Sequence, residues 1–555
     1  MKSKIVYLMA LLATIWSCSD EFTEQTAFGS LSDESLKNAQ GIELLLVGAY
    51  SGLDGMTDTG GADWEKTGDN WWFDVMADDM HKGSTNSDQA DLFLLETYDW
   101  QTANPYIGNK WRSLYAATNR ANAVINQISL VTEGDFSAQL AEARFLRGLF
   151  NFEIQKIWGN VPYISEENFA AFEFNQPNSG PIWDQIEADL SYAASNLPTS
   201  QGLVGKPSQK TAKAFLAKAH LYQREYQAAY DILVTLIGQW SLNPEFVDSF
   251  RAAGENSAES VFAIQFVADA GLSFNGNRGS TLNFPSGGPI GSCCGFGQPT
   301  QDLANAYKVD ANGLPLLDDF NKSDIKNDYG ITSAQAFAPE TGLLDPRIDY
   351  TIGRRGIDFN GWGVMPGKDW IRAEFGDISG PYLTKKNFYW VGDDANRGTG
   401  GWGEQRSGIN YHFMRYSDVL LMAAEAAAET GKLDEALGWV NQVRNRAKNM
   451  TPVGGKGSPA ANYKVEPYPS FPSQDYAVKA VRFERRLELA TEGHRLFDLR
   501  RWGNAAEVMN TYKVNEKRAI TSFLMADYQS KHDLCPIPLN AIDGSVGTLQ
   551  QNPGY

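Results

Sequence analysis

Apolar side chains recur at helical spacing in the N-terminal part of the chain and again in its C-terminal part. Residues 137–159 place them three or four positions apart along one stripe, at Phe145, Leu146, Leu149, Phe150 and Ile157. This spacing is typical of an amphipathic helix that buries one face. Residues 109–128 carry a similar pattern, and the short connection between the two segments contains a Gly-Asp turn. The pattern therefore predicts a helical hairpin.

Two later segments repeat the hairpin pattern. In residues 211–238 small alanines alternate with large aromatic residues around a short turn, and in residues 416–448 Gly431 ends one helix before KLDEAL starts the next. Glycine at the turn, alanine at the close helix contact and bulky residues outside look like a tetratricopeptide hairpin. We predict a mainly α fold, a scaffold of about four tetratricopeptide-like hairpins stacked neighbour on neighbour.

Helical spacing disappears between residues 241 and 410. This segment is rich in Gly, Pro, Asn and aromatic residues, and a long segment without helical period is either disordered or a functional insert. Disordered segments are depleted in aromatic residues, so we predict an ordered, loop-rich insert with short strands that forms a ligand face. It would pack on a helical frame of residues 34–240 and 411–530, within a single domain of residues 34–555.

The N-terminal end has the features of an export signal. Two lysines precede an apolar run at residues 5–16, which is too short to span a bilayer and fits a secretory signal. Ser17 followed by Cys18 resembles the cleavage site of bacterial lipoproteins, whose new N-terminal cysteine is lipidated. We predict a signal peptide at residues 1–17, lipidation at Cys18 and an acidic tether at residues 18–33. The alternative is an ordinary secretion signal with an incidental cysteine.

Composition narrows the functional classes. The net charge is −19 at pH 7 and the isoelectric point is about 4.8, so the surface repels phosphate backbones and we expect no nucleic-acid partner. After Cys18 only Cys293, Cys294 and Cys535 remain, and the adjacent pair is either a vicinal disulfide or two reduced thiols. The five His are scattered singly, and we expect no metal site and no cofactor.

Residues 482–503, RFERRLELATEGHRLFDLRRWG, combine a helical apolar pattern with many charges. Three interpretations are a catalytic site, a docking face for an anionic partner and a structural element. Opposite charges lie one turn apart: Arg485 with Glu488, Glu492 with Arg495, and His494 with Asp498. Nothing isolates one pair as a general acid and base, so we predict a structural ion network that holds a C-terminal helix against the scaffold.

The same segment carries a family resemblance. ERRLELATEGHRLFDLRRWG resembles the C-terminal signature of the SusD/RagB family of outer-membrane glycan-binding lipoproteins of Bacteroidetes. Further similar motifs are WRSLYAATNRANAVI, AEARFLRGLFNFEIQKIWGNVPY, QKTAKAFLAKAHLYQ, GFGQPTQDLANAY, FMRYSDVLLMAAEA and the terminal LCPIPLNAIDGSVGTLQQNPGY. The resemblance implies a lipid-anchored protein facing the cell exterior, which covers a SusC-like TonB-dependent outer-membrane transporter and binds oligosaccharide for import. It also implies that the protein is not an enzyme.

Sugar-binding chemistry indicates candidate ligand residues. A pyranose ring stacks on an aromatic face, and its hydroxyl groups call for Asp, Asn, Lys or Arg beside it. Two non-helical stretches combine these residue types, and we predict ligand contacts from Trp71, Trp72, Asp79, Lys82, Trp100, Asn104, Tyr106, Trp362, Trp370 and Trp390. The resemblance implies that Trp100 and Asn104 best match the family's stacking aromatic and its hydrogen-bonding neighbour. The alternative for each Trp is packing beneath the loops.

We predict that the ligand is a neutral glucan, such as a laminarin-type β-glucan or an α-glucan. The acidic chain disfavours sulfated or uronic polymers, and the candidate stretches hold many aromatic residues but few clustered basic ones. Two alternatives stay open, a peptide-binding, RagB-like import lipoprotein and a glycoside hydrolase. A hydrolase needs two carboxylates at a set separation. Asp78 and Asp79 are the nominees, although adjacent side chains rarely face one ligand.

Overall fold

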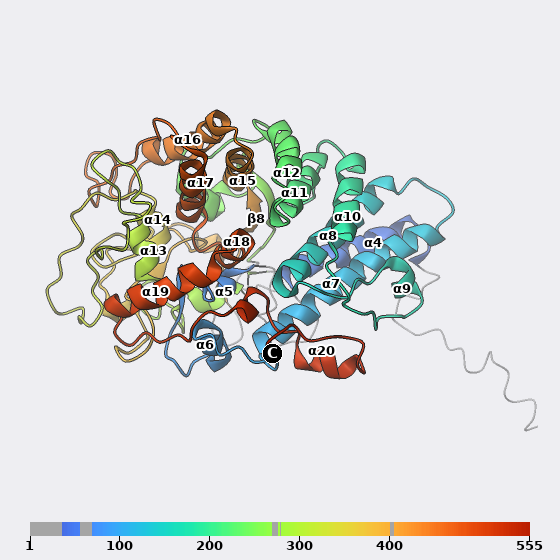
Figure 1. Ribbon diagram of the computed structural model, residues 1–555, viewed down its shortest axis with the longest axis horizontal. Coiled ribbons are helices and arrows are strands. Elements are labelled where there is room, and N and C mark those ends of the chain that lie inside the picture. Colours follow the sequence, from blue (N-terminus) through green and yellow to red (C-terminus); the bar gives the residue numbers. More distant parts are fainter. Residues whose placement is uncertain (1–35, 56–68, 269–275, 278, 400–404) are drawn as a thin grey trace, which may run out of the picture.

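The computed structural model describes residues 36–55, 69–268, 276–277, 279–399 and 405–555. Within these ranges helices dominate, and Figure 1 shows them in two groups on either side of the molecule. None of the described helices combines the length and the hydrophobicity that a membrane crossing requires. Cys18, with the predicted signal and tether, lies outside the described residues.

The first group of helices packs in the order of the sequence. Its members are α4 (Ala39–Tyr50), α7 (Pro105–Leu130), α8 (Ser137–Trp158), α9 (Glu166–Ala170), α10 (Trp183–Asn196), α11 (Gln209–Tyr222) and α12 (Tyr226–Leu233). α7 packs against α8, α8 against α10, α10 against α11, and α11 against α12. The predicted hairpins of residues 109–159 and 211–238 correspond to α7–α8 and α11–α12. Contacts between successive helices are the pattern of a helical-repeat scaffold.

The second group of helices continues the scaffold from α12. It contains α15 (Tyr416–Glu429), α16 (Leu433–Asn449), α17 (Gln474–Leu489), α18 (Arg495–Trp502) and α19 (Ala505–Ala519). The short helix α20 (Leu539–Gly544) follows in the chain but lies on the side of the first group, near α7 (Figure 1). α12 contacts α15, and α15 packs against both α16 and α17. Gly431 has a φ of 78° in the turn between α15 and α16. This left-handed conformation favours glycine, so Gly431 has the role that the sequence predicts.

Short strands and loops replace the helical pattern in the insert. In the described part of the chain each strand has one antiparallel partner: β1 (Met80–Gly83) with β3 (Phe296–Pro299), β2 (Ser260–Ile264) with β8 (Tyr411–Arg415), β4 (Ile352–Gly353) with β5 (Leu383–Thr384), and β6 (Arg397–Thr399) with β7 (Gln405–Ser407). Met80 lies opposite Pro299, and Ser260 lies opposite Arg415. Short helices α13 (Gln301–Ala306) and α14 (Ile348–Thr351) lie between the strands.

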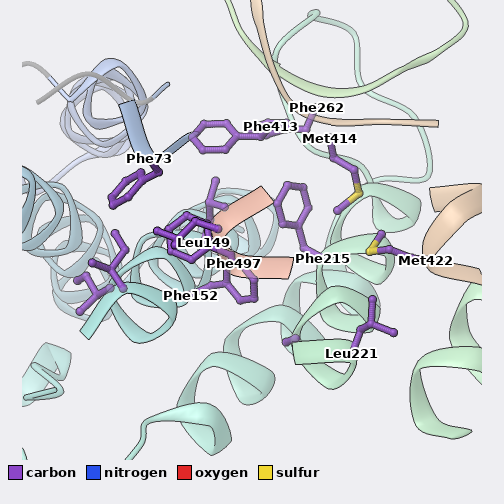
Figure 2. Packing of buried hydrophobic residues seen from close by; sticks show 14 of the residues in the cluster. Phe73, Leu149, Phe152, Phe215, Leu221, Phe262, Phe413, Met414, Met422 and Phe497 are labelled. Atoms are coloured by element: carbon purple, nitrogen blue, oxygen red, sulfur yellow. The ribbon is translucent and has the colours of Figure 1, made fainter. Parts of the chain in front are cut away.

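An apolar core joins the insert to the helical scaffold, as Figure 2 shows. The ring centroid of Phe262 in β2 lies 5.1 Å from that of Phe145 in α8 and 6.0 Å from that of Phe215 in α11. On the neighbouring strand β8, Phe413 stacks on Phe262 at 6.2 Å. Aromatic contacts of this kind add to the stabilisation from burial itself. β2 therefore fixes the insert to two scaffold helices.

The charged segment at residues 482–503 forms a buried ion network. The carboxylate of Glu488 is fully buried, lies 3.0 Å from Arg347 and 2.5 Å from Arg415, and also pairs with Arg446. Arg415 ends β8 and Arg446 belongs to α16, so Glu488 connects α17 to two other elements. Charges at this depth persist only when they are paired. The prediction of a structural ion network is confirmed.

The individual partners differ from the predicted one-turn pairs. Arg485 lies 2.6 Å from Asp498, Glu492 lies 2.7 Å from Lys386, and Arg495 lies 2.7 Å from Asp78. Burial, reinforced by the charge of Lys218, lowers the pKa of His494 to about 3, so at neutral pH it carries no charge for an ion pair. α17 ends at Leu489 and α18 begins at Arg495, so the helical spacing assumed for Glu492 and Arg495 is interrupted between them.

The adjacent cysteines are joined to each other. Cys293 and Cys294 form a vicinal disulfide, which is one of the two alternatives that the sequence leaves open. Backbone hydrogen bonds fix the surrounding loop, because Ser292 donates to the Pro285 carbonyl and Gly295 to the Phe284 carbonyl, both at 2.8 Å. The remaining described cysteine, in the C-terminal segment, is buried and free.

Candidate ligand-binding face

The first group of predicted ligand residues lies in the core. Trp71 and Trp72 begin the short helix α5 (Trp71–Asp74), and their side chains are 4% and 0% exposed. The Trp72 ring stacks on Phe73 at 3.9 Å and meets Tyr106 edge-on at 5.6 Å. α5 packs against α18, a contact that local sequence cannot reveal. The burial of these two rings contradicts the predicted ligand contacts and agrees with the alternative, packing in the core.

The segment that leads into α7 is also structural. Trp100 is 4% exposed, stacks on Tyr98 with ring centroids 5.2 Å apart, and donates its indole N–H to the Leu95 carbonyl at 2.8 Å. Asn104 is the N-cap of α7, and its side-chain oxygen accepts from the backbone N–H of Tyr106 at 3.0 Å. Asparagine followed by proline is a helix N-terminus signature. That signal gives Asn104 a structural role in place of the predicted ligand contact.

Lys82 and Asp79 make their contacts inside the protein. The Lys82 ammonium donates to three backbone carbonyls of its own loop at 2.7–2.9 Å, and burial lowers its pKa to about 8. Asp79 is fully buried and accepts from Arg486 at 2.7 Å. Both side chains hold the scaffold together and present no group to the surface.

The adjacent carboxylates Asp78 and Asp79 do not form a hydrolytic pair. Asp78 is 1% exposed and accepts two hydrogen bonds from Arg495, each of 2.7 Å. Burial alone would raise the pKa of Asp78, but the charges of Arg486 and Arg495 outweigh it and hold that pKa below its usual value. A general acid needs a raised pKa and access to the leaving group. Asp78 has neither.

The second group of predicted residues divides into buried and accessible rings. Trp370 is 8% exposed and meets Phe359 edge-on at 5.8 Å. The loop at Gly288 passes so close that a Cβ there would lie 2.3 Å from the Trp370 ring. Trp362 and Trp390 are half-buried, so part of each ring faces solvent. These two remain candidate ligand residues.

A tight turn positions Trp362. Asn360 and Gly361 have φ angles of 53° and 80°, the left-handed pair of a type I′ turn. The turn is closed by a 2.9 Å hydrogen bond from the Trp362 backbone N–H to the Phe359 carbonyl. The indole N–H of Trp362 donates to the Tyr389 carbonyl at 2.9 Å. These bonds fix the orientation of the ring without burying it.

The segment around Trp390 lies beside this turn. The backbone N–H of Val391 donates to the Asn360 carbonyl at 3.2 Å. Two exposed aliphatic side chains belong to the same two segments, with Val364 63% exposed and Val391 58% exposed. We name Trp362, Val364, Trp390 and Val391 the aromatic platform.

Charges of both signs surround the aromatic platform. The Arg397 guanidinium lies 5.6 Å from the centroid of the Trp362 ring, and the Arg251 guanidinium lies 5.9 Å from the centroid of the Trp390 ring. Asp358 and Asp393 accept hydrogen bonds from backbone N–H groups of the two platform segments at 2.7 and 2.9 Å. Each guanidinium lies over a ring, and aromatic rings with donors and acceptors close by are suited to a sugar ring. The sequence prediction missed these four charged residues.

Similarity to known proteins extends over most of the chain. A model described as "SusD family" matches residues 258–555, and a second, described as "Starch-binding associating with outer membrane", matches residues 47–221. The first match covers more than half of the 555 residues. The chain belongs to the SusD family. The resemblance seen in the sequence motifs is thereby confirmed.

Relatives of this SusD-family chain match all or most of its length. SusD-like protein P2 of Formosa agariphila is 24% identical over 100% of both chains, and a SusD-like protein of Bacteroides ovatus is 23% identical over 81% of this chain and 77% of its own. Two solved structures are similar in fold. A laminarin-binding SusD-like protein has a TM-score of 0.67 at 22% identity, covering 93% of this chain and 100% of its own. Surface glycan-binding protein A of Bacteroides thetaiotaomicron, in complex with laminarihexaose, has a TM-score of 0.63 at 20% identity, covering 93% and 99%. The mainly helical, tetratricopeptide-like fold is confirmed.

Proposed function

We propose that this SusD-family protein captures a glycan at the cell surface, without cleaving it, and delivers it to a SusC-like TonB-dependent transporter. The observation that carries the proposal is the aromatic platform. It presents two tryptophan side chains that are partly open to solvent, and the Trp362 ring is held by the hydrogen bond from its indole N–H to the Tyr389 carbonyl. Rings that are already ordered lose little entropy when a sugar stacks on them, which favours binding.

A neutral glucan of laminarin type is the ligand that fits this platform best. Two guanidinium groups and two carboxylates surround the rings, so the platform offers no excess of positive charge to a sulfated or uronic polymer. The chain as a whole carries −19 charges and repels such polymers over longer distances. The laminarin-binding protein and the laminarihexaose complex of similar fold support this choice.

Trp362→Ala and Trp390→Ala are each expected to weaken binding of laminarihexaose by about 1–3 kcal/mol, the contribution of one stacked aromatic ring. The dissociation constant would rise roughly 5- to 150-fold for each substitution. Isothermal titration calorimetry measures the effect, and circular dichroism verifies that each variant is folded. Because binding neutralises no charge, affinity should change little between low and high salt.

Trp240→Ala is the matched control, since Trp240 is another half-buried tryptophan outside the platform. It should bind like the unchanged protein. If the platform variants bind with the affinity of the unchanged protein, neither tryptophan belongs to the site.

Other ligand classes give different results. Binding to alginate or pectin alone, weakening with salt, would exclude the neutral glucan. Binding to peptides with no response to glycans would favour a peptide importer, and release of reducing ends from a glycan would favour a hydrolase.

We also propose that Cys18 anchors the protein to the outer membrane through lipid. The signal-like sequence before Cys18 and the match to a family described as associating with the outer membrane support this assignment. Cys18→Ala is expected to move the protein from the outer-membrane fraction to a soluble or uncleaved form, because several acyl chains anchor stably where none does. Fractionation followed by immunoblotting is the measurement. An unchanged membrane fraction would exclude Cys18 as the anchor.

A further inference from the structure

A cleft of about 870 Å³ lies apart from the aromatic platform. Helices α17, α18 and α19 enclose it together with residues 317–322, and none of the platform residues is among the described residues that line it. The three helices are labelled in the left half of Figure 1. The volume falls within the range of about 300–1,000 Å³ that small-molecule sites occupy.

One face of each long helix turns toward this cleft. α17 contributes Lys479, Arg482 and Arg486, and α19 contributes Glu507, Thr511 and Asn515. Residues three or four positions apart share one side of a helix. Thr511 and Glu507 are exposed and Asn515 is half-exposed, so the α19 wall offers a hydroxyl, a carboxylate and an amide to a ligand.

The floor of the cleft is ionic and internally neutralised. Arg486 lies 2.8 Å from Asp302 and 3.0 Å from Asp78, and Arg495 lies 2.7 Å from Asp78. All four side chains are buried or nearly so. An anionic ligand would have to break one of these pairs, and breaking a buried pair is strongly unfavourable. The cleft therefore favours an uncharged ligand.

Aromatic rings complete the cleft. Trp502 and Phe320 both line it. The Arg482 guanidinium lies 4.9 Å from the Trp502 ring and 2.8 Å from Glu429. Trp502 is only 9% exposed and this guanidinium covers its ring, so the half-buried Phe320 is the ring that can meet the C–H face of a saccharide.

We propose that this cleft is a second saccharide site, which holds a short neutral oligosaccharide between α17 and α19. The ligand class rests on the proposed function, whereas the place of binding rests on the cleft itself. A polymer that occupies the platform and the cleft on the same molecule would gain avidity, because the second contact is intramolecular.

The proposal is tested by filling the cleft in a variant that lacks both platform tryptophans. The double variant Trp362→Ala/Trp390→Ala is titrated by calorimetry with laminarihexaose, maltohexaose, cellohexaose and xylohexaose. Thr511→Trp is then added to fill the cleft from an exposed position. Val514→Trp is the matched control, since Val514 is 70% exposed on the same helix and does not line the cleft.

The double variant is expected to bind at least one hexasaccharide. Thr511→Trp should weaken that binding at least tenfold, and Val514→Trp should leave it within twofold. A double variant that binds none of the four sugars, or a Thr511→Trp that binds as the control does, overturns the cleft site. The platform variants could also bind as the unchanged protein does and lose binding only when Thr511→Trp is added. That result would exclude the platform as a ligand site and support the cleft.

Discussion

Glu488→Gln is expected to lower the free energy of unfolding by about 3–5 kcal/mol, the typical loss when a buried ion pair is broken from one side. The substitution keeps the shape of the side chain and removes its charge. Three guanidinium groups, from Arg347, Arg415 and Arg446, then share one fewer buried carboxylate. Burial alone would raise the pKa of Glu488, but these guanidinium groups outweigh it and hold that pKa well below its usual value. The native carboxylate is therefore charged at neutral pH.

Asp318→Asn is the matched control for this substitution. Asp318 lies 2.7 Å from Lys479, and the two side chains are 71% and 51% exposed. An exposed pair of this kind contributes about 0–1 kcal/mol, so the control should stay close to the unchanged protein. Urea denaturation followed by circular dichroism compares the three proteins. Equal midpoints for all of them would show that the network adds nothing to stability.

Trp100→Ala is expected to destabilise the fold by about 3–5 kcal/mol, the usual loss for a buried tryptophan in a core. The ring packs 5.2 Å from Tyr98 and 4.9 Å from His532, and the Arg500 guanidinium lies 5.5 Å from its centroid. Removing the ring leaves a cavity among these partners. Binding per folded molecule should remain unchanged, although the family resemblance places Trp100 in the ligand site.

Thermal unfolding and calorimetric titration of the same sample separate the two roles of Trp100. Trp100→Phe should recover part of the stability, because it restores a ring and loses only the 2.8 Å hydrogen bond to Leu95. The platform variant Trp362→Ala should show the opposite pattern, with weaker binding and a smaller loss of stability. If Trp100→Ala leaves the midpoint of thermal unfolding unchanged and weakens binding, Trp100 contacts the ligand after all.

The helical scaffold could be predicted because its signal is local. The apolar stripe at residues 137–159 lies within one element, α8 (Ser137–Trp158), and periodicity alone locates such a helix. The Asn360–Gly361 turn carries an equally local signal, since an Asn-Gly pair is the strongest short hairpin sequence. Both signals need no knowledge of the tertiary fold.

Burial and ion pairing could not be predicted in the same way. Trp72 sits in a four-residue helix, which is too short for its periodicity to show which side is covered. Its ring meets Tyr106, and the helix itself packs against α18. Glu488 was assigned to Arg485 three residues away, whereas its partners Arg415 and Arg347 are 73 and 141 residues distant. Such contacts depend on how separate elements meet in space.

The type I′ turn under Trp362 bears on how this surface can diverge among paralogues. Main-chain hydrogen bonds hold the turn, from Trp362 to Phe359 and from Val391 to Asn360, and most side chains can be replaced without losing such bonds. Glu488 and the Phe262 cluster, which stabilise the fold, lie among buried residues elsewhere in the chain. On the proposed function, a substitution at Trp362 can therefore change which polymer is bound while the fold stays intact.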